Sequence, residues 1–283
     1  YLGQLNRHVD MQPRRRLHRA HDHGGDERVD HPGVQKPDMR AHHARQFLCG
    51  AVRHIAQFLD LLLHLLAQLE RCGWRLALPH FRGCSGELNR RPRAYHSGDS
   101  AEIDWILRRL HAANGQRPLH AAGISLGGNA LLKWAGEHGS TAGELVSGVA
   151  AICAPLDLAA CGHHLARGFN RVYTQYFLKT LKAVSADRLR QHPGLFDGQR
   201  MQQAINLFQF DDVVTGPIHG FAGAADYWQR SSAKPWLKSI AVPTLAINPK
   251  NDPFLPARHL PTQAEASPFV RLEQPATGGH VGF

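Results

Sequence analysis

The stretch Gly123-Ile124-Ser125-Leu126-Gly127-Gly128-Asn129 decides how the rest of this sequence is interpreted. It contains the pattern Gly-x-Ser-x-Gly, in which glycines two before and two after a serine leave room for a tight strand-to-helix turn. Such a turn exposes the serine hydroxyl and directs the next N–H, that of Leu126, at a negatively charged oxygen. A strand-like run at 119–122 precedes the pattern and an alanine- and leucine-rich helical stretch follows it. This context favours Ser125 as a nucleophile over a glycine-rich packing turn.

Helical and strand-like segments alternate on both sides of this turn. The apolar spacing predicts helices at 52–69, 100–113 and 126–137, and strands at 74–79, 118–122, 145–153, 241–248 and 269–273. This alternation predicts an α/β fold with a mostly parallel sheet. Consecutive helical stretches at 165–184, 186–191, 200–208 and 222–229 interrupt the alternation. They predict a helical cap inserted into the domain at about 157–235.

A serine nucleophile needs a base, and the base needs a carboxylate that orients it. In this architecture the carboxylate and the histidine follow the serine in the chain, on loops after later strands. Asp252 follows the predicted strand 241–248, and His280 follows the predicted strand 269–273. The alternatives are a turn aspartate before proline and a surface histidine. The positions after the carboxyl ends of strands favour Asp252 and His280 as catalytic partners of Ser125.

Other polar residues have weaker claims to a role. His80, Arg82, Tyr95 and His96 precede the serine turn, and we expect them to line the mouth of the site. The pair Asp211-Asp212 lacks a third ligand, so a helix cap or solvated turn is favoured over a metal site. Cys84 has no base placed for it, so we interpret it as a small buried residue.

Composition limits the class of protein. The 283 residues are 43% hydrophobic and 20% charged, which is enough to bury a sizeable core. The five cysteines form no Cys-x-x-Cys pair, and no apolar run is long enough to span a membrane. The first residues do not have the pattern of a signal peptide. These features predict a cytoplasmic protein without a membrane span.

Residues 1–50 differ from the rest of the chain. Residues 1–55 hold 8 of the 20 histidines and 10 of the 33 lysines and arginines, against 6 of the 23 acidic residues. No helical or strand periodicity continues through them, so we interpret 1–50 as disordered or translated out of frame, ahead of a domain at 51–283. A polyanion-binding arm is the alternative. Basic arms usually contain interleaved aromatic residues, whereas Tyr1 is the only aromatic residue here before Phe47, so we expect no nucleic-acid partner.

The sequence resembles the YheT-like α/β-hydrolases, a family of esterases, from about residue 58 to the end. Four segments carry the likeness in the right order and spacing: His80 to Glu87 (HFRGCSGE), Tyr95 to Asp99 (YHSGD), Gly123 to Asn129 (GISLGGN), and Asn251 to Phe254 (NDPF) together with Gly278 to Phe283 (GGHVGF). The resemblance implies an α/β-hydrolase fold. It also implies Ser125 as nucleophile, His280 as general base and then acid, and Asp252 as its partner.

The resemblance further implies hydrolysis of carboxylic esters of short-chain or lipid-like acyl groups, small-molecule substrates, and no metal or organic cofactor. A thioesterase, an amidase or an acyltransferase would use the same three residues.

Two features of this sequence depart from the family. The loop that supplies its second oxyanion donor should lie within residues 1–55 but is not found there, and the helix that ordinarily follows His280 is missing. A catalytically impaired or inactive hydrolase fragment is therefore the alternative interpretation.

Overall fold

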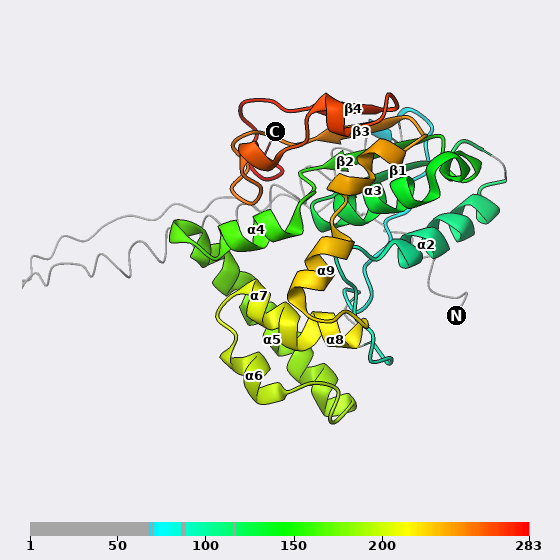
Figure 1. The fold of residues 1–283 in the computed structure, drawn as a ribbon. Helices are drawn as coiled ribbons and strands as arrows, with labels where there is room; N and C mark the ends of the chain where they lie inside the picture. The colour runs from blue at the N-terminus through cyan, green and yellow to red at the C-terminus, as the bar shows by residue number, and fades with distance from the viewer. Residues whose placement is uncertain (1–67, 70, 86–88, 116, 283) are drawn as a thin grey trace, which may run out of the picture. The chain divides into compact units, whose positions relative to one another are not determined.

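The computed structural model describes residues 68–69, 71–85, 89–115 and 117–282, all within the unit formed by residues 50–283. The centre of this unit is a parallel sheet with strand order β1-β2-β3-β4 (Figure 1). The strands are β1 (His120–Ile124), β2 (Gly148–Ile152), β3 (Thr244–Ile247) and β4 (Val270–Glu273). Since all are parallel, their carboxyl ends lie at one edge of the sheet, where sites form in folds of this kind.

Two long helices pack beside the first two strands. Helix α3 (Leu126–His138) lies against β1 and β2, and α2 (Ser100–Ala113) packs on α3. The side chains of Leu132 and Trp134 on α3 are fully buried. Their burial fixes the helix that begins at the serine turn, because removing a large core side chain costs about 2–5 kcal/mol.

Helices fill the chain between β2 and β3 and form a separate layer beside the sheet (Figure 1). They are α4 (Leu158–Leu165), α5 (Arg171–Gln191), α6 (Gly198–Gln203), α7 (Leu207–Phe210), a π-helical turn (Asp211–Thr215), α8 (Gly216–Ile218) and α9 (Ala224–Ser231). Buried Leu178, Met201 and Phe210 give this layer an apolar core of its own. The remaining short 3-10 helices are Gly139–Glu144, Gly168–Asn170, Lys234–Ser239, Ala257–His259 and Gln263–Glu265.

The predicted α/β fold with a parallel sheet and inserted helices is confirmed. The helix expected at 100–113 has those bounds. The strand expected at 118–122 lies two residues later, at 120–124, and the three later strands are present but shorter. The separate helices expected at 165–184 and 186–191 are one continuous helix, α5, and the stretch expected at 200–208 is broken between α6 and α7.

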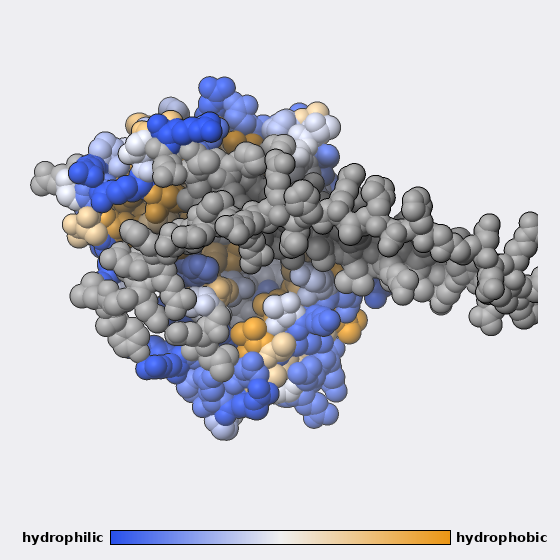
Figure 2. Space-filling model, turned by 180° about the vertical axis from the view of Figure 1, so that it is seen from behind, coloured by the Kyte–Doolittle hydropathy of each residue, from blue (hydrophilic) through white to orange (hydrophobic). Residues whose placement is uncertain are grey.

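The strand predicted at 74–79 is absent, which corrects the sequence interpretation. These residues are exposed and have no regular secondary structure, with Trp74, Leu76 and Leu78 exposed by 51%, 43% and 58%. A strand needs a neighbour for its backbone hydrogen bonds, and no described strand pairs with this segment. Trp74 instead stacks on His120 of β1, with ring centroids 5.0 Å apart. Hydrophobic surface is visible among hydrophilic areas on the rear face (Figure 2).

Several predictions fall on residues outside the described part. They include most of the helix expected at 52–69 and the interpretation of residues 1–50. Within the described residues, no helix is both long enough and apolar enough to cross a membrane.

Candidate active site

Ser125 occupies a strained turn between β1 and α3. Its φ angle is +51°, a left-handed conformation that side chains rarely adopt, and its N–H donates to the Ile152 carbonyl at 2.7 Å. A Cβ atom on Gly123 would lie 2.5 Å from the Gly127 carbonyl oxygen, and one on Gly128 would lie 2.9 Å from the Gly123 oxygen. A Cβ atom on Gly127 would meet no atom closer than 3.8 Å. After the serine, the residue that must be glycine for steric reasons is therefore Gly128, one position later than the sequence pattern indicated.

The structure brings Asp252 and His280 to Ser125. The Nε2 atom of His280 lies 3.0 Å from the Ser125 hydroxyl, and its Nδ1 atom lies 2.9 Å from Oδ2 of Asp252. An ionised carboxylate only accepts hydrogen bonds, so Nδ1 carries the proton and Nε2 accepts from the hydroxyl. The Asp252 side chain is 2% exposed and that of His280 is 18% exposed.

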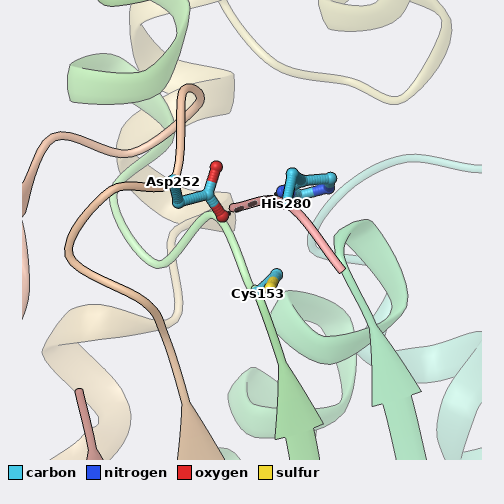
Figure 3. Close-up of side chains that lie close together, drawn as sticks. All are labelled: Cys153, Asp252 and His280. Atoms are coloured by element: carbon cyan, nitrogen blue, oxygen red, sulfur yellow. Dashed lines mark hydrogen bonds and ion pairs between the residues drawn. The ribbon is translucent and has the colours of Figure 1, made fainter. Parts of the chain in front are cut away.

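Backbone contacts hold the loops that carry these two side chains. Asp252 receives a second hydrogen bond at Oδ1 from the Phe254 N–H, at 2.8 Å. The side-chain oxygen of Asn251 accepts the Gly279 N–H, also at 2.8 Å, which ties the aspartate loop to the histidine loop. Figure 3 shows the resulting Asp252–His280 pair with Cys153 beside it. Hydrogen bonds from neighbouring residues therefore help to hold both loops in place.

Backbone strain gathers at this site. In the described part of the chain, the non-glycine residues with positive φ are Ser125, Cys153 and Val281, at +51°, +52° and +61°. Cys153 directly follows β2, and its sulfur accepts the Val281 N–H at 3.3 Å. Residues in such conformations cost about 1–3 kcal/mol each and cluster where the surrounding structure requires them for function.

The surroundings of the site are apolar and aromatic. The ring of Phe254 lies 4.1 Å from that of His280, centroid to centroid, and also contacts Tyr173 and Phe177 of α5. Burial raises the pKa of the Cys153 thiol to about 11, and burial also raises that of Cys161. Both thiols are therefore protonated near neutral pH. A low-dielectric surrounding of this kind strengthens the polar contacts inside it.

Leu126 is the first residue of α3, and the first N–H groups of a helix have no partner within it. Its N–H is the predicted oxyanion donor and lies at the positive end of the helix dipole. The ring of Phe81 lies 3.8 Å from the Cβ position of Gly127, and Tyr95 stacks on Phe81 with centroids 5.1 Å apart. Tyr95 is thus one ring away from the serine turn, and burial raises its pKa.

Two of the predicted mouth residues make their contacts elsewhere. His80 is exposed, and its Nδ1 lies 3.3 Å from the Cys84 carbonyl oxygen. Arg82 donates to Glu102 of α2 at 3.1 Å. Cys84 itself is exposed and not buried as the sequence indicated. Within this sequence motif, Arg82 is therefore paired with α2, whereas the neighbouring Phe81 lies against the serine turn.

His96 lies in a buried polar network. Its ring is 4.7 Å from that of His219, and its Nδ1 accepts the Gly98 N–H at 3.2 Å. Burial first, and then the positive charges of His219, Arg93 and Lys133, lower the pKa of His96 to about 3. His96 is consequently neutral at physiological pH. In the described part of the chain its ring packs with His219, Phe221 and Tyr227, and it does not contact Ser125, Asp252 or His280.

Sequence reasoning missed two residues of the site. Phe254 belongs to the quoted segment Asn251 to Phe254 but was given no role, although its ring covers His280. Cys153 ends the strand predicted at 145–153, and a residue just after a parallel strand was the available signal. Both contacts join residues far apart in sequence, so no local pattern indicated them.

A serine at a strained strand-to-helix turn, with its hydroxyl facing a histidine at the carboxyl edge of a parallel sheet, defines the class of nucleophile-elbow α/β proteins. A model of the family described as alpha/beta hydrolase fold matches residues 55–283, and the chain therefore belongs to this family.

Individual relatives agree with this assignment. The chain is 40% identical over 221 residues to "Putative esterase YheT" of Escherichia coli (strain K12), and the matched region covers 77% of this chain and 64% of that protein. It is 29% identical over 227 residues to "Phospholipase ABHD3" of Homo sapiens, and the matched region covers 78% of this chain and 54% of that protein. The chain thus spans less than two thirds of either relative. Among solved structures, the esterase EaEST from Exiguobacterium antarcticum has a TM-score of 0.41 and 19% identity, over 71% of this chain and 72% of that one.

Proposed function

We propose that this protein is a serine hydrolase that cleaves carboxylic esters with a Ser125–His280–Asp252 triad. The observation that carries the proposal is the chain of two hydrogen bonds, 3.0 Å from Ser125 to His280 and 2.9 Å from His280 to Asp252. These lengths fall in the range in which a base takes a proton from a nucleophile. The names of the relatives, an esterase and a phospholipase, support the same class of reaction.

The reaction would proceed through an acyl-enzyme. Ser125 Oγ attacks the ester carbonyl while His280 Nε2 takes its proton, and Asp252 stabilises the resulting imidazolium. The Leu126 N–H donates to the oxyanion, which then collapses and expels the alcohol, protonated by His280. Water, activated by the same imidazole, attacks the acyl-enzyme, releases the acid and restores Ser125.

An apolar acyl group suits this site best. Phe254 lies between His280 and the aromatic residues Tyr173 and Phe177 of α5, so one wall beside the reacting atoms is made of rings. Aromatic walls bind hydrocarbon by burying its surface, at about 25 cal/mol per Å². The helices within 157–235 would accordingly act as a cap that shapes acyl selectivity, on a hydrolase domain at 51–283.

An inactive hydrolase fragment is the second candidate. The second oxyanion donor is expected within residues 1–55, where the sequence has no matching loop, and the chain spans 64% of the YheT relative. Loss of one such donor typically costs about 2.7–4 kcal/mol of transition-state stabilisation. The fold and the three site residues would then persist with little or no turnover.

Covalent labelling with a fluorophosphonate probe separates the two candidates, because the probe reacts only with an activated serine. We expect one label per molecule in the folded protein and none in Ser125→Ala. The control is Ser239→Ala, which changes an exposed serine outside the site and should label like the parent.

Hydrolysis of p-nitrophenyl esters of increasing acyl length then tests the reaction and its selectivity. Equal labelling of the parent and Ser125→Ala would contradict the nucleophile assignment. A folded parent protein that neither labels nor hydrolyses any ester of the series would favour the inactive fragment.

A further inference from the structure

Cys153 is a site residue for which the proposed reaction has no use. It is 1% exposed at the carboxyl end of β2, and its side chain lies next to the Asp252–His280 pair (Figure 3). One potential ligand atom from each of Cys153, Asp252 and His280 lies within 4.8 Å of the other two. A sulfur, a carboxylate oxygen and an imidazole nitrogen therefore converge on one point.

This donor set matches one kind of ion. Zn²⁺ accepts cysteine, histidine and aspartate together, and its open sites use three protein ligands with water in the fourth position. Bonds of about 2.0–2.3 Å place tetrahedral ligands about 3.5 Å apart. A ligand atom at the 4.8 Å limit would therefore move inward by about 1 Å, whereas the His280–Asp252 pair, at 2.9 Å, would open slightly. Gly278 and Gly279, directly before His280, have φ angles of +151° and +59° and lack side chains that would restrict a shift of this loop, during which the bond from the Gly279 N–H to Asn251 would have to adjust.

The orientation of the sulfur supports this geometry. The Val281 N–H donates to Sγ of Cys153 at 3.3 Å, so the sulfur faces the histidine loop. Burial raises the pKa of the Cys153 thiol more than the Val281 N–H lowers it, so the thiol is protonated until a bound ion displaces its proton. The ion's two positive charges would be balanced by one thiolate and one carboxylate, with the imidazole neutral.

We propose that Cys153, Asp252 and His280 form an inhibitory binding site for a thiophilic divalent cation, with Zn²⁺ as the best match. The effect on activity rests on the proposed function, whereas the binding does not. The ion takes the place of the proton between Nδ1 of His280 and the Asp252 carboxylate, and it displaces the thiol proton of Cys153 into solvent. The site thereby couples the proposed hydrolase to the supply of free Zn²⁺.

Inhibition follows from the position of one proton. In the metal-free site, His280 carries its proton on Nδ1, and Nε2 accepts from Ser125. Once Nδ1 binds the metal, the ring proton moves to Nε2, which then donates to the serine and no longer takes its proton. The imidazole keeps the same number of protons, but its Nε2 can no longer accept the proton of Ser125. Ser125 therefore loses its base, and catalysis stops.

Cobalt absorption tests the binding independently of activity. Co²⁺ is added to protein freed of metal by a chelator, and thiolate-to-cobalt charge transfer is recorded in the near ultraviolet. We expect a band that saturates at one equivalent, disappears in Cys153→Ala and persists in Cys72→Ser and Cys84→Ser, whose thiols are exposed. Any Co²⁺ held by the histidines of residues 1–50 would give no band of this kind, because the band needs a thiolate ligand.

Fluorophosphonate labelling with and without Zn²⁺ tests the inhibition. We expect Zn²⁺ to suppress labelling of Ser125, a chelator to restore it, and Cys153→Ala to need about ten to a hundred times more Zn²⁺ for equal suppression. Cys153→Ser, close in size, serves if the alanine variant does not fold. Equal Zn²⁺ sensitivity of parent and variant, or no thiolate band in the parent, would overturn the proposal. Absent labelling without metal would instead count against the proposed function, and the cobalt band would still decide the site.

Discussion

The loops around His280 and His96 place two histidines in similar packing but in opposite electrostatic surroundings. Their side chains are 18% and 11% exposed, and both rings lie against aromatic residues. His280 faces the Asp252 carboxylate at 2.9 Å. His96 faces His219 and accepts a backbone N–H, while the nearby Asp99 carboxylate is bonded to Arg93.

Burial is the main cause that lowers the pKa of His96, and the charges of His219, Arg93 and Lys133 add to it, whereas His280 is hydrogen-bonded to a carboxylate. An ionised carboxylate stabilises the imidazolium that a general base becomes, whereas burial among other positive groups keeps a ring neutral. The sequence analysis expected His280 to be the base of the site and His96 to line its mouth. Variants that exchange or remove these partners therefore test the comparison directly.

The largest expected effect comes from His280. Replacing His280 with Gln removes the base while preserving a polar side chain, and we expect kcat/KM for ester hydrolysis to fall by about 10⁶-fold. The control is His120→Gln, an exposed histidine at the start of β1, away from the carboxyl edge of the sheet. A His280→Gln variant that kept the parent rate would remove His280 from the mechanism.

Asp252 tests whether the carboxylate is what separates the two histidines. Asp252→Asn presents an amide where Nδ1–H needs an acceptor, which favours the wrong tautomer, and kcat should fall by about 10⁴-fold. Asp187→Asn, on α5, is the matched control, since Asp187 pairs with Arg190 on the same helix. A loss of less than about tenfold would mean that His280 does not depend on this partner.

The surroundings of His96 are tested by measuring how the stability of the folded protein depends on pH. Its folded pKa of about 3 lies below the unfolded value of about 6.5, so the unfolded chain binds the extra proton between these pH values. The contribution to stability is therefore fully present above about pH 6.5 and is lost as pH falls toward 3, on the order of 4 kcal/mol across the window.

Replacing His96 with Asn keeps an oxygen that accepts the Gly98 N–H and removes the titrating group. Urea unfolding at about pH 5 and about pH 7 should show a smaller difference in the variant than in the parent. Tyr227→Phe is the control, because it removes a hydroxyl bond to Ser97 in the same network without removing a titration in this range. An unchanged pH dependence in His96→Asn would mean that His96 is not held neutral by the fold.

The smallest expected effect concerns the aromatic neighbour of His280. Phe254→Ala opens the wall toward α5, and we expect kcat/KM for long acyl esters to fall about 10–100-fold relative to acetyl esters. Phe269→Ala is the control, because Phe269 is 51% exposed away from the site. Equal losses for all acyl lengths would show that Phe254 supports His280 rather than the substrate.

Local patterns in the sequence were sufficient to predict the parallel sheet, because its strands have clear apolar runs. They also indicated that Ser125, Asp252 and His280 each follow a strand, and their catalytic roles stay predictions. They failed at 74–79, where an apolar run has the composition of a strand but no described neighbour pairs with it. They also missed Phe254 and Cys153, whose contacts cross more than 20 residues of sequence. Periodicity indicates elements, whereas the partner of a side chain is fixed only by tertiary packing.

The left-handed backbone of Val281 has a consequence for engineering this protein. A β-branched residue at φ +61° is held there against its preference by about 1–2 kcal/mol, and glycine would relieve that cost. Laboratory evolution for heat resistance alone would therefore favour glycine at this position. The same replacement would make the backbone next to His280 more flexible. Selection for thermal stability would therefore favour glycine at position 281, whereas selection for turnover would favour valine.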